Sequence, residues 1–417
     1  MAQLSDDCFA FGGQLMSVDE AMELIKRTLT HVTSLEPVPL GEADGRVLAE
    51  NVLAPQPLPP FDNSAVDGWA VAFADLNPNG ETRLPIGGRI AAGKSSMGVE
   101  VAGRAVRVFT GAPIPKDSDT IFMQEDTHWD DEHVVLPHGL RRGANVRLAG
   151  EDVAVGSVLL PAGRRLRPQD LALAAAVGKG ELPVWRRLRV AVFSTGDELQ
   201  EVGSPLPANA TYDSNRILLR ALMKRDGVTV SDLGIIRDDP VSLRERLVGA
   251  AQDCDLIVTT GGVSTGEEDH VKAAVEAAGR LFFWRIGIKP GRPVAMGGVK
   301  GTPFVGLPGN PVAAFVTYCC VVRPVMACLS GAVAEFPRTA PVKMGFDYRK
   351  KLGRREFVRV HVAQLSDGST EARLFPKSGA GILTSLTDAD GMVVLPEDQA
   401  DIKAGAIVPF LAYEMLL

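Results

Sequence analysis

Short apolar runs and amphipathic stretches alternate along the second half of the chain. The pattern predicts strands at residues 188–193, 228–236, 255–260, 281–288 and 303–307, and helices at 213–225, 240–252, 267–278 and 311–328. Alternation of this kind predicts a parallel or mostly parallel sheet with helices on both faces. We therefore expect a doubly wound α/β domain.

The first 187 residues follow a different pattern. Ser17 and Glu20 have the spacing of a capping box, and the apolar stripe that follows predicts a helix. Further helices are predicted at residues 46–52 and 168–177. The stretch between them has proline and glycine between short predicted strands at 105–110, 120–124 and 134–136. We expect a small β domain inserted into an elongated, helical N-terminal domain.

Near the C-terminus, Val358, Val360 and Val362 alternate with polar residues, as in a half-buried strand. The chain is also too long for one core, so several domains are expected. The predicted division is 1–54 with 149–187 for the N-terminal linker domain, 55–148 for the inserted β domain, 188–330 for the α/β domain and 331–417 for the C-terminal domain.

Polar motifs follow the predicted strands of the α/β domain. They are Ser194–Glu198, Arg237–Asp239, Thr260–Ser264 and Leu307–Pro311. Ligands of open α/β sheets bind beyond the carboxyl ends of the strands, so these loops are expected to line one crevice. The glycines at 261 and 262 let a backbone approach a ligand, and the helix that follows favours an anion at its N-terminus.

The predicted crevice mixes the two signs of charge. Lys289 and Arg292 suit an anion, whereas carboxylates occur at Asp197, Glu198, Asp238 and Asp269. A carboxylate repels a phosphate unless a divalent cation lies between them, and Mg²⁺ prefers oxygen ligands. His270, beside Asp269, is at most an outer residue of this site.

Three loops in the N-terminal half also carry functional groups. Residues 61–70 place two acids, an amide and a hydroxyl after a proline-stiffened segment. Thr110–Pro113 and Asn145–Asp152 combine polar side chains with tight turns. Each loop can be read either as a turn stabilised by its own side chains or as part of a site.

Composition excludes several classes of function. The chain has 417 residues, a net charge of −7 and 6% aromatic residues, which argues against a nucleic-acid groove. The N-terminus does not resemble a secretory signal, and the apolar stretch 311–322 is shorter than the about 20 residues of a membrane helix. Five scattered cysteines indicate reduced thiols rather than disulfides or zinc ligands. We expect a cytoplasmic protein without membrane contact.

Taken together, the motifs resemble those of the MoeA family of molybdopterin molybdenumtransferases, to which the E domain of gephyrin belongs. They run in order from Phe61 to Pro311: FDNSAVDG, FSTGDEL, YDSN, GGVSTGEED, KPGRP and GLPGNP. The resemblance extends from about residue 16 to 410. It implies a MogA-like α/β domain, a C-terminal β-barrel, and a reaction of adenylylated molybdopterin with molybdate that yields molybdenum cofactor and AMP and requires Mg²⁺.

The resemblance also implies roles for residues. Pterin and phosphate contacts would come from Asn215, Gly261, Gly262, Ser264, Gly266, Asp269, Lys289, Gly291, Arg292, Pro308, Gly309, Asn310 and Pro311. The catalytic set would be Asp62, Thr110, Arg147, Asp152, Glu198, Asp238 and Lys289, with Glu198, Asp238 and Asp269 as Mg²⁺ ligands. Molybdate would be attracted by Arg147, Arg285 or Arg292. Arg285 and Arg292 stand where a lysine is common in the family. The planar guanidinium of arginine keeps the charge of the lysine ammonium group but not its geometry.

The N-terminal catalytic residues fit this scheme if the protein is a homodimer in which one subunit covers the crevice of the other. The resemblance further suggests contacts with a molybdopterin adenylyltransferase and with proteins that mature molybdoenzymes. Two alternatives are a molybdopterin adenylyltransferase, which would not need the first 180 residues, and a gephyrin-like dimeric scaffold. Arg354, Arg355 and residues 378–381 are interpreted as solvated strand ends rather than substrate contacts.

Overall fold

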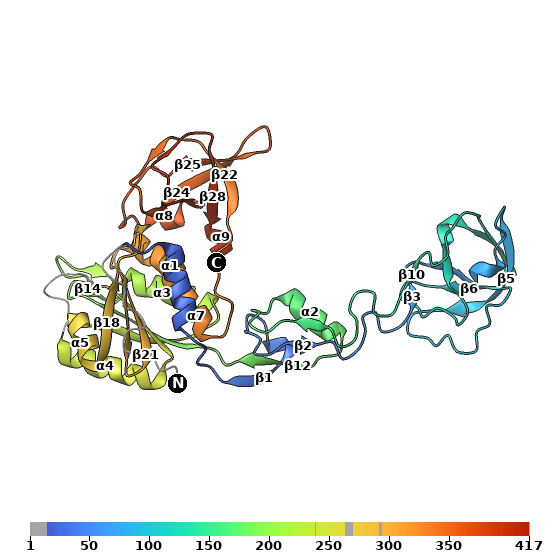
Figure 1. The fold of residues 1–417 in the computed structure, drawn as a ribbon, viewed down its shortest axis with the longest axis horizontal. Coiled ribbons are helices and arrows are strands. Elements are labelled where there is room, and N and C mark those ends of the chain that lie inside the picture. Colours follow the sequence, from blue (N-terminus) through green and yellow to red (C-terminus); the bar gives the residue numbers. More distant parts are fainter. Residues whose placement is uncertain (1–14, 238, 263–269, 292–293, 417) are drawn as a thin grey trace.

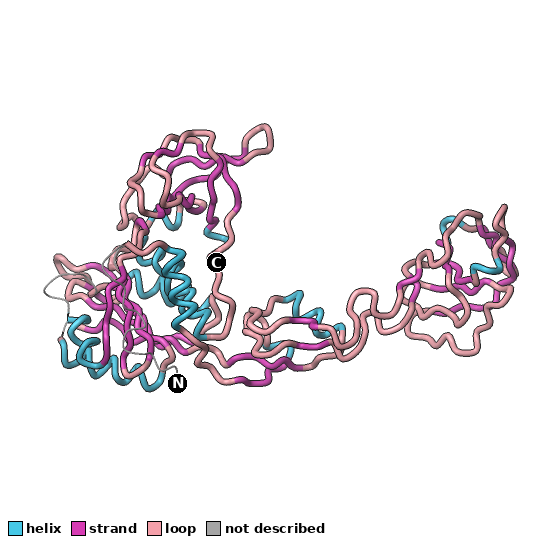
Figure 2. Tube along the Cα trace, in the orientation of Figure 1, coloured by secondary structure: helices cyan, strands magenta, loops and turns pink. Residues whose placement is uncertain are grey.

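The computed structural model describes residues 15–237, 239–262, 270–291 and 294–416. The molecule is elongated (Figure 1): a body formed by the α/β domain and a C-terminal barrel continues through a narrow linker into a separate β domain at the far end. Figure 2 shows that helices are concentrated in the body, whereas the far domain consists mainly of strands and loops.

The α/β domain contains a mixed sheet with the strand order β16-β13-β17-β21-β20-β18. Strands β16, β13, β17 and β21 are parallel neighbours, and β20 and β18 are antiparallel. The mostly parallel sheet is therefore confirmed. Its strands are β13 (Arg189–Thr195), β16 (Thr229–Ile236), β17 (Leu256–Thr260), β18 (Gly279–Trp284), β20 (Val294–Val299) and β21 (Thr302–Leu307), and a short pair is formed by β14 (Leu199–Gln200) and β15 (Thr211–Tyr212).

The sequence pattern does not predict one strand of this sheet, β20, and it predicts too long a strand at β18. The run 281–288 ends at Trp284 as β18, and β20 pairs with it. Strand β20 contains Gly297 and Gly298, which weaken a strand signal. Glycine is needed there, since a Cβ at Gly297 would lie 2.2 Å from the Arg280 carbonyl oxygen.

Helices cover both faces of the sheet. One face packs on α1 (Val18–Thr28), α3 (Ser214–Arg225), and a continuous helical rod of α6 (Pro311–Thr317), η4 (Tyr318–Val322) and α7 (Arg323–Leu329). The other packs on α4 (Pro240–Asp253) and α5 (His270–Ala278). Ser17 and Glu20 form the predicted capping box of α1. The predicted division placed this helix in the linker domain, but Val18, Ala21 and Ile25 are buried in the core of the α/β domain.

The rod at Pro311–Leu329 has the length and composition of a membrane span, and 83% of it is buried inside the protein. Val316, Val321 and Val322 are fully buried in the core beneath the sheet. The rod is thus the core helix predicted from the sequence.

The linker domain is built mainly from strand pairs. The predicted helix at 46–52 is wrong, because Val47 and Leu48 form antiparallel bridges with Arg165 and Val184. Leu48 is fully buried, so packing outweighs the local helical spacing. The elements are β1 (Leu35–Pro39), η1 (Leu40–Glu42), β2 (Val52–Leu53), β11 (Val158–Leu160), α2 (Pro168–Ala176) and β12 (Glu181–Trp185).

The inserted domain is the predicted small β domain, with the strand order β7-β4-β6-β5-β9-β8 and a ribbon of β3 and β10 at its base. Trp69 and Phe122 belong to its core. The elements are β3 (Asn63–Ser64), β4 (Gly68–Val71), η2 (Phe73–Asp75), β5 (Thr82–Ile90), β6 (Ala105–Val108), β7 (Thr120–Met123), η3 (Gln124–Asp126), β8 (His128–Trp129), β9 (His133–Leu136) and β10 (Val146–Arg147).

The C-terminal domain is a closed barrel with the order β24-β25-β22-β28-β26, closed by the pairing of β24 with β26. Strand β19 (Ile288–Lys289) of the α/β domain extends it by pairing with the start of β24. The remaining elements are β22 (Ala340–Met344), β23 (Tyr348–Arg349), β24 (Arg355–Gln364), β25 (Thr370–Leu374), α8 (Thr384–Thr387), β26 (Gly391–Leu395), β27 (Asp401–Ile402), β28 (Ile407–Ala412) and α9 (Tyr413–Leu416).

Barrel closure gives a stability test. A Cβ at Gly391 would lie 2.3 Å from the Leu411 carbonyl oxygen, so Gly391→Ala must separate β26 from β28. We expect Gly391→Ala to lower the free energy of unfolding by about 1–3 kcal/mol. Gly249→Ala, in the interior of α4 with nothing within 4 Å, is the control and should raise it by about 1 kcal/mol. Thermal unfolding that shifts in the same direction for both variants would contradict this account.

Candidate active site

The carboxyl ends of the parallel strands meet at one edge, as predicted, and Asn215 joins them. This residue lies in the first turn of α3 and is 9% exposed. Its Nδ2 donates to the Gly309 carbonyl oxygen (2.7 Å) and to Thr260 Oγ1 (3.0 Å). Thr260 Oγ1 in turn donates to the Pro308 carbonyl oxygen (3.2 Å). The loops after β17 and β21 are thereby fixed against the start of α3, and we call this region the crevice.

One polar atom of the Asn215 side chain has no hydrogen-bond partner in the described part of the chain. This atom is Oδ1, which is buried. A buried acceptor without a donor is costly, so such an atom needs an explanation. A ligand with an N–H or O–H group in the crevice would supply the donor.

The glycines of the crevice have different structural roles. A Cβ at Gly261 would lie 2.6 Å from the Thr195 carbonyl oxygen, and one at Gly262 would lie 2.4 Å from Thr195 Cγ2. Both have positive φ angles, so the close turn requires glycine. At Gly309, a Cβ would meet only the Cα of Gly261, at 3.8 Å. The missing side chain of Gly309 therefore leaves open space beside the strand ends.

Glu198 lies on the loop after β13, at the same sheet edge, and is exposed. Its backbone carbonyl accepts a hydrogen bond from the Thr211 N–H (2.8 Å), which ties it to β15. Its predicted partners Asp238 and Asp269 lie outside the described residues, as do Ser264, Gly266 and Arg292. Within the described ranges there is no group of three His, Cys, Asp or Glu side chains that could hold a metal. The exposed oxygens of Glu198 suit Mg²⁺, and the metal site stays a prediction.

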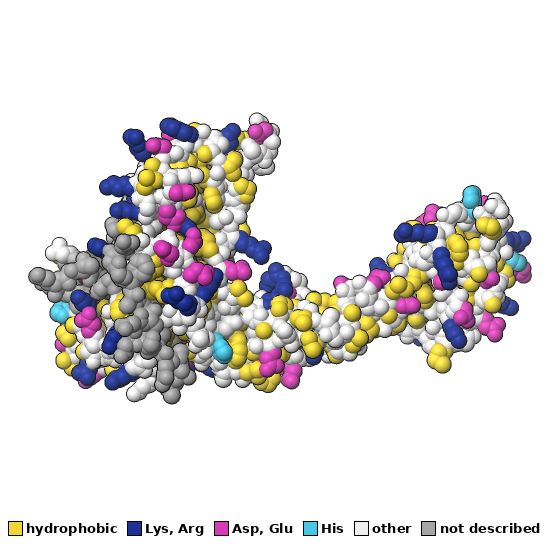
Figure 3. Space-filling model, in the orientation of Figure 1, with side chains coloured by type: hydrophobic (Ala, Val, Ile, Leu, Met, Phe, Trp, Pro, Cys, Tyr) yellow, Lys and Arg dark blue, Asp and Glu magenta, His cyan; other side chains and the backbone are white. Residues whose placement is uncertain are grey.

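Next to the crevice lies a cavity of about 490 Å³ between the α/β domain and the barrel, which we call the basic cavity. Pro308 and Asn310 border both spaces. The cavity lining includes Lys289, Gly291, Arg354, Arg359, Lys377, Ser378 and Gly379. On the face drawn in Figure 3, Lys and Arg side chains gather along one edge of the barrel, above the α/β domain.

A buried carboxylate organises the cavity wall. Glu356, 2% exposed, accepts hydrogen bonds from Lys289 Nζ and from the Tyr348 hydroxyl, both at 3.0 Å. Burial and then the Glu356 charge raise the pKa of Tyr348 to about 12, so the hydroxyl keeps its proton. Burial also lowers the pKa of Arg359, whose Nη2 donates to the Gly379 carbonyl oxygen (2.9 Å). An anion in the cavity would offset the cost of burying that guanidinium.

The rod α6–α7 begins at this cavity. Asn310 is the residue before the first turn, and its side chain makes no capping hydrogen bond. One of the first N–H groups, that of Val312, donates to the Ala380 carbonyl oxygen of the barrel (3.0 Å). The N-terminal end of a helix favours negative charge. The backbone therefore adds to the field of the basic side chains.

The predicted N-terminal site residues also come together, but elsewhere. The ribbon pairs Arg147 with Asn63, and Asp62 Oδ1 accepts a hydrogen bond from the Ala149 N–H (2.7 Å). Thr110 donates to Asp67 Oδ1 from both its N–H and its hydroxyl (2.8 Å each). These two hydrogen bonds hold the pKa of Asp67 below its usual value. Asp67 is a further residue of this group, and it was not among the predicted site residues.

Asp152 follows on the same loop as Arg147, and its N–H donates to the Leu58 carbonyl oxygen (3.0 Å), ahead of the Asp62 loop. We call Asp62, Thr110, Arg147 and Asp152 the arm patch. Arg147 is exposed and forms no ion pair within the described ranges. Within one chain the arm patch lies far from the crevice, since β3 and β10 are at the opposite end of the molecule from β14 (Figure 1).

The structure gives the surroundings of the remaining basic and polar candidates. Arg354, which is half-buried, and Ser378, which is exposed as expected of a solvated strand end, both line the basic cavity. Arg285 lies outside the cavity lining, and its carbonyl accepts a hydrogen bond from the Met16 N–H, ahead of α1 (2.9 Å). Arg355 pairs with Asp19 (2.8 Å) and Glu397 (3.1 Å) instead of facing the cavity. The sequence gives no signal for these positions, because barrel closure decides which strand ends face the α/β domain.

Comparison with known proteins agrees with this geometry. Three family models match consecutive parts of the chain: the MoeA N-terminal region (domains I and II) over residues 16–178, a probable molybdopterin binding domain over 191–327, and the MoeA C-terminal region (domain IV) over 341–413.

Relatives match over nearly the full length. The molybdopterin molybdenumtransferase of Haemophilus influenzae is 35% identical over 97% of this chain and 100% of its own. Molybdopterin molybdenumtransferase 2 of Mycobacterium tuberculosis is 36% identical over 88% of this chain and 92% of its own. A crystal structure of the molybdopterin biosynthesis MoeA protein from Pyrococcus horikoshii OT3 has a TM-score of 0.80 and 29% identity, and the match covers 96% of this chain and 100% of that one. The chain therefore belongs to the MoeA family of molybdopterin molybdenumtransferases.

Proposed function

We propose that this protein inserts molybdenum from molybdate into adenylylated molybdopterin and releases AMP, in the last step of molybdenum cofactor biosynthesis. The observation that carries the proposal is the continuity of the crevice with the basic cavity through Pro308 and Asn310. A pterin phosphate in the first space and an oxyanion in the second would be neighbours. Bringing two reactants together in this way can account for a large part of catalysis.

The crevice residues hold and orient the pterin substrate. The free Oδ1 of Asn215 accepts an N–H group, and the space beside Gly309 admits the ligand close to the backbone. Glu198, with Asp238 and Asp269, would hold Mg²⁺ on the diphosphate side of the site. Mg²⁺, when bound, neutralises the phosphate oxygens and assists departure of AMP.

The basic cavity holds molybdate. Lys289, Arg354 and Arg359 present charged donors, and Ser378 adds a hydroxyl. The ion pair with Glu356 keeps Lys289 in position without cancelling the cavity's excess positive charge. The sulfur ligands of molybdenum come from the pterin dithiolene, so the chain's own thiols are not required. Cys319 and Cys320 are fully buried, and burial raises their pKa values.

The arm patch completes the site of a second subunit. Its exposed Arg147 and Asp152 are too remote from their own crevice, and the length of the arm suits a homodimer with exchanged arms. We further propose a cytoplasmic enzyme that contacts a molybdopterin adenylyltransferase and molybdoenzyme maturation proteins when substrate and product are transferred. An adenylyltransferase or a scaffold alone gives no role to both the arm patch and the basic cavity.

Glu198→Gln tests the proposed chemistry. The substitution keeps the shape and removes the negative charge, so AMP release from adenylylated molybdopterin with Mg²⁺ and molybdate should fall about 100-fold or more. Glu276→Gln on the exposed face of α5 is the control and should leave the rate unchanged. Absence of AMP release by the wild-type protein, with substrate binding intact, would refute the enzyme and favour a scaffold.

Arg354→Gln tests the basic cavity. Loss of one charged donor should raise the half-saturating molybdate concentration roughly tenfold while the KM for the pterin substrate stays the same. Arg349→Gln is matched to it, because Arg349 lies on the same barrel but pairs with Asp401 outside the cavity (3.1 Å). An unchanged molybdate dependence for Arg354→Gln would place the oxyanion elsewhere.

Mixing inactive variants tests the shared site. Arg147→Ala and Glu198→Gln should each be inactive alone, and subunit exchange should restore roughly a quarter of wild-type activity. Half of the dimers are then mixed, and each mixed dimer has one complete site of two. AMP release after partial unfolding and refolding of the mixture is the measurement. If activity does not return although mixed dimers are detected, the arm patch does not act across subunits.

A further inference from the structure

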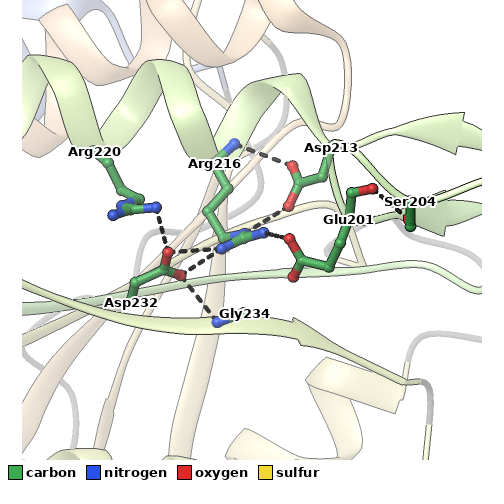
Figure 4. A network of polar contacts seen from close by, with 7 residues as sticks. All are labelled: Glu201, Ser204, Asp213, Arg216, Arg220, Asp232 and Gly234. Atoms are coloured by element: carbon green, nitrogen blue, oxygen red, sulfur yellow. Dashed lines mark hydrogen bonds and ion pairs between the residues drawn. The ribbon is translucent and has the colours of Figure 1, made fainter.

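A buried arginine connects three elements beside the crevice. Arg216 lies in the first turn of α3 and is 3% exposed. Figure 4 shows its guanidinium surrounded by the carboxylates of Asp213, Glu201 and Asp232. These acids belong to the residue before α3, the loop between β14 and β15, and strand β16.

The contacts of Arg216 are short and use the whole guanidinium. Nε pairs with Asp213 Oδ2 (2.7 Å), Nη1 with Asp232 Oδ1 (2.6 Å) and Nη2 with Glu201 Oε2 (2.5 Å). Asp213 Oδ1 also accepts the Arg216 backbone N–H as the helix cap (3.1 Å). Such geometry suits arginine and cannot be reproduced by lysine, which offers a point charge.

Burial of charge makes this cluster costly. Desolvation opposes it at Arg216, but the three carboxylates together raise the arginine's pKa above its ordinary value. Burial opposes the charged form of Asp232 too, and by itself would raise the pKa of this carboxyl. Hydrogen bonds from the Gly234 N–H and from Arg216 outweigh that effect and hold the pKa of Asp232 below its ordinary value. Arg216 and Asp213 are buried, whereas the side chains of Asp232 and Glu201 are partly exposed. Replacing buried ion pairs by apolar groups is often neutral or stabilising, and exposed pairs contribute little, so stability alone does not account for the arrangement.

The cluster is connected to the crevice in two ways, through α3 and through the loop between β14 and β15. Asn215, which fixes the loops after β17 and β21, precedes Arg216 directly in α3. The loop held through Glu201 carries Glu198 at its start, and it returns through Thr211, whose N–H binds the Glu198 carbonyl. The Asp213 N–H donates to the Gln200 carbonyl oxygen (3.1 Å), which closes the same loop.

We propose that Arg216 is a positioning residue that fixes the Glu198 loop in register with Asn215 through its ion pair to Glu201. The inference rests on the proposed function, because it assigns Glu198 to the Mg²⁺ and diphosphate side of the site. Arg216 touches no substrate in this scheme. It acts on Glu198 through the loop and on Asn215 through the first turn of α3.

Glu201→Ala is the sharpest test. Glu201 is more than half exposed at its side chain, and Arg216 keeps its ion pairs with Asp213 and Asp232, so the thermal unfolding temperature should hardly change. The loop keeps its backbone hydrogen bonds but loses its side-chain link to Arg216, so the Mg²⁺ concentration for half-maximal AMP release should rise roughly tenfold. Arg216→Lys should give the same rise together with a loss of stability.

Arg220→Gln is the matched control. Arg220 lies one turn further along α3 and pairs with Asp232 (2.5 Å), but with neither Glu201 nor Asp213. Its loss should leave the Mg²⁺ dependence within about twofold of wild type. A wild-type protein that releases no AMP would defeat the proposed function itself. An active wild type with an unchanged Mg²⁺ dependence and KM in Glu201→Ala would overturn the positioning role alone.

Discussion

The hydrogen bonds of the Asn215 side chain are the constraint on which the site depends. Parallel strands bring the loops after β17 and β21 to one edge, but they do not set the distance between those loops. The amide of Asn215 does so, because it donates to Gly309 and Thr260 at once. One buried side chain thus helps to fix the shape of the crevice, and its remaining oxygen accepts no hydrogen bond from the described residues.

The barrel contributes most of the positive charge around the basic cavity, through Arg354, Arg359 and Lys377. Strand β19 pairs with β24, so Lys289 and Glu356 become neighbours at the junction of two domains. The buried carboxylate orients the lysine, while Arg354 and Arg359 remain available to the cavity. Anionic ligands are therefore expected at a domain boundary, where a shift of the barrel would change the spacing of the cations.

The elongated shape separates groups that the proposed chemistry needs together. Asp62, Thr110 and Arg147 gather at the base of the inserted domain through the pairing of β3 with β10. The crevice lies at the other end of the molecule. In the proposed homodimer a second subunit would bring these groups together, since the linker's strand pairs hold the arm away from its own body.

The sequence by itself determined the α/β order, the capping box at Ser17 and the convergence of strand-end motifs, because these follow from local periodicity and from the geometry of parallel sheets. It could not determine that residues 46–52 form strand bridges, that α1 packs on the α/β domain, or that Arg354 faces the cavity while Arg285 does not. Each of these depends on partners distant in the chain, such as Val184 for Leu48 and the β19–β24 pairing for Arg354. Local patterns specify which face of an element is apolar, and only tertiary packing decides what covers that face.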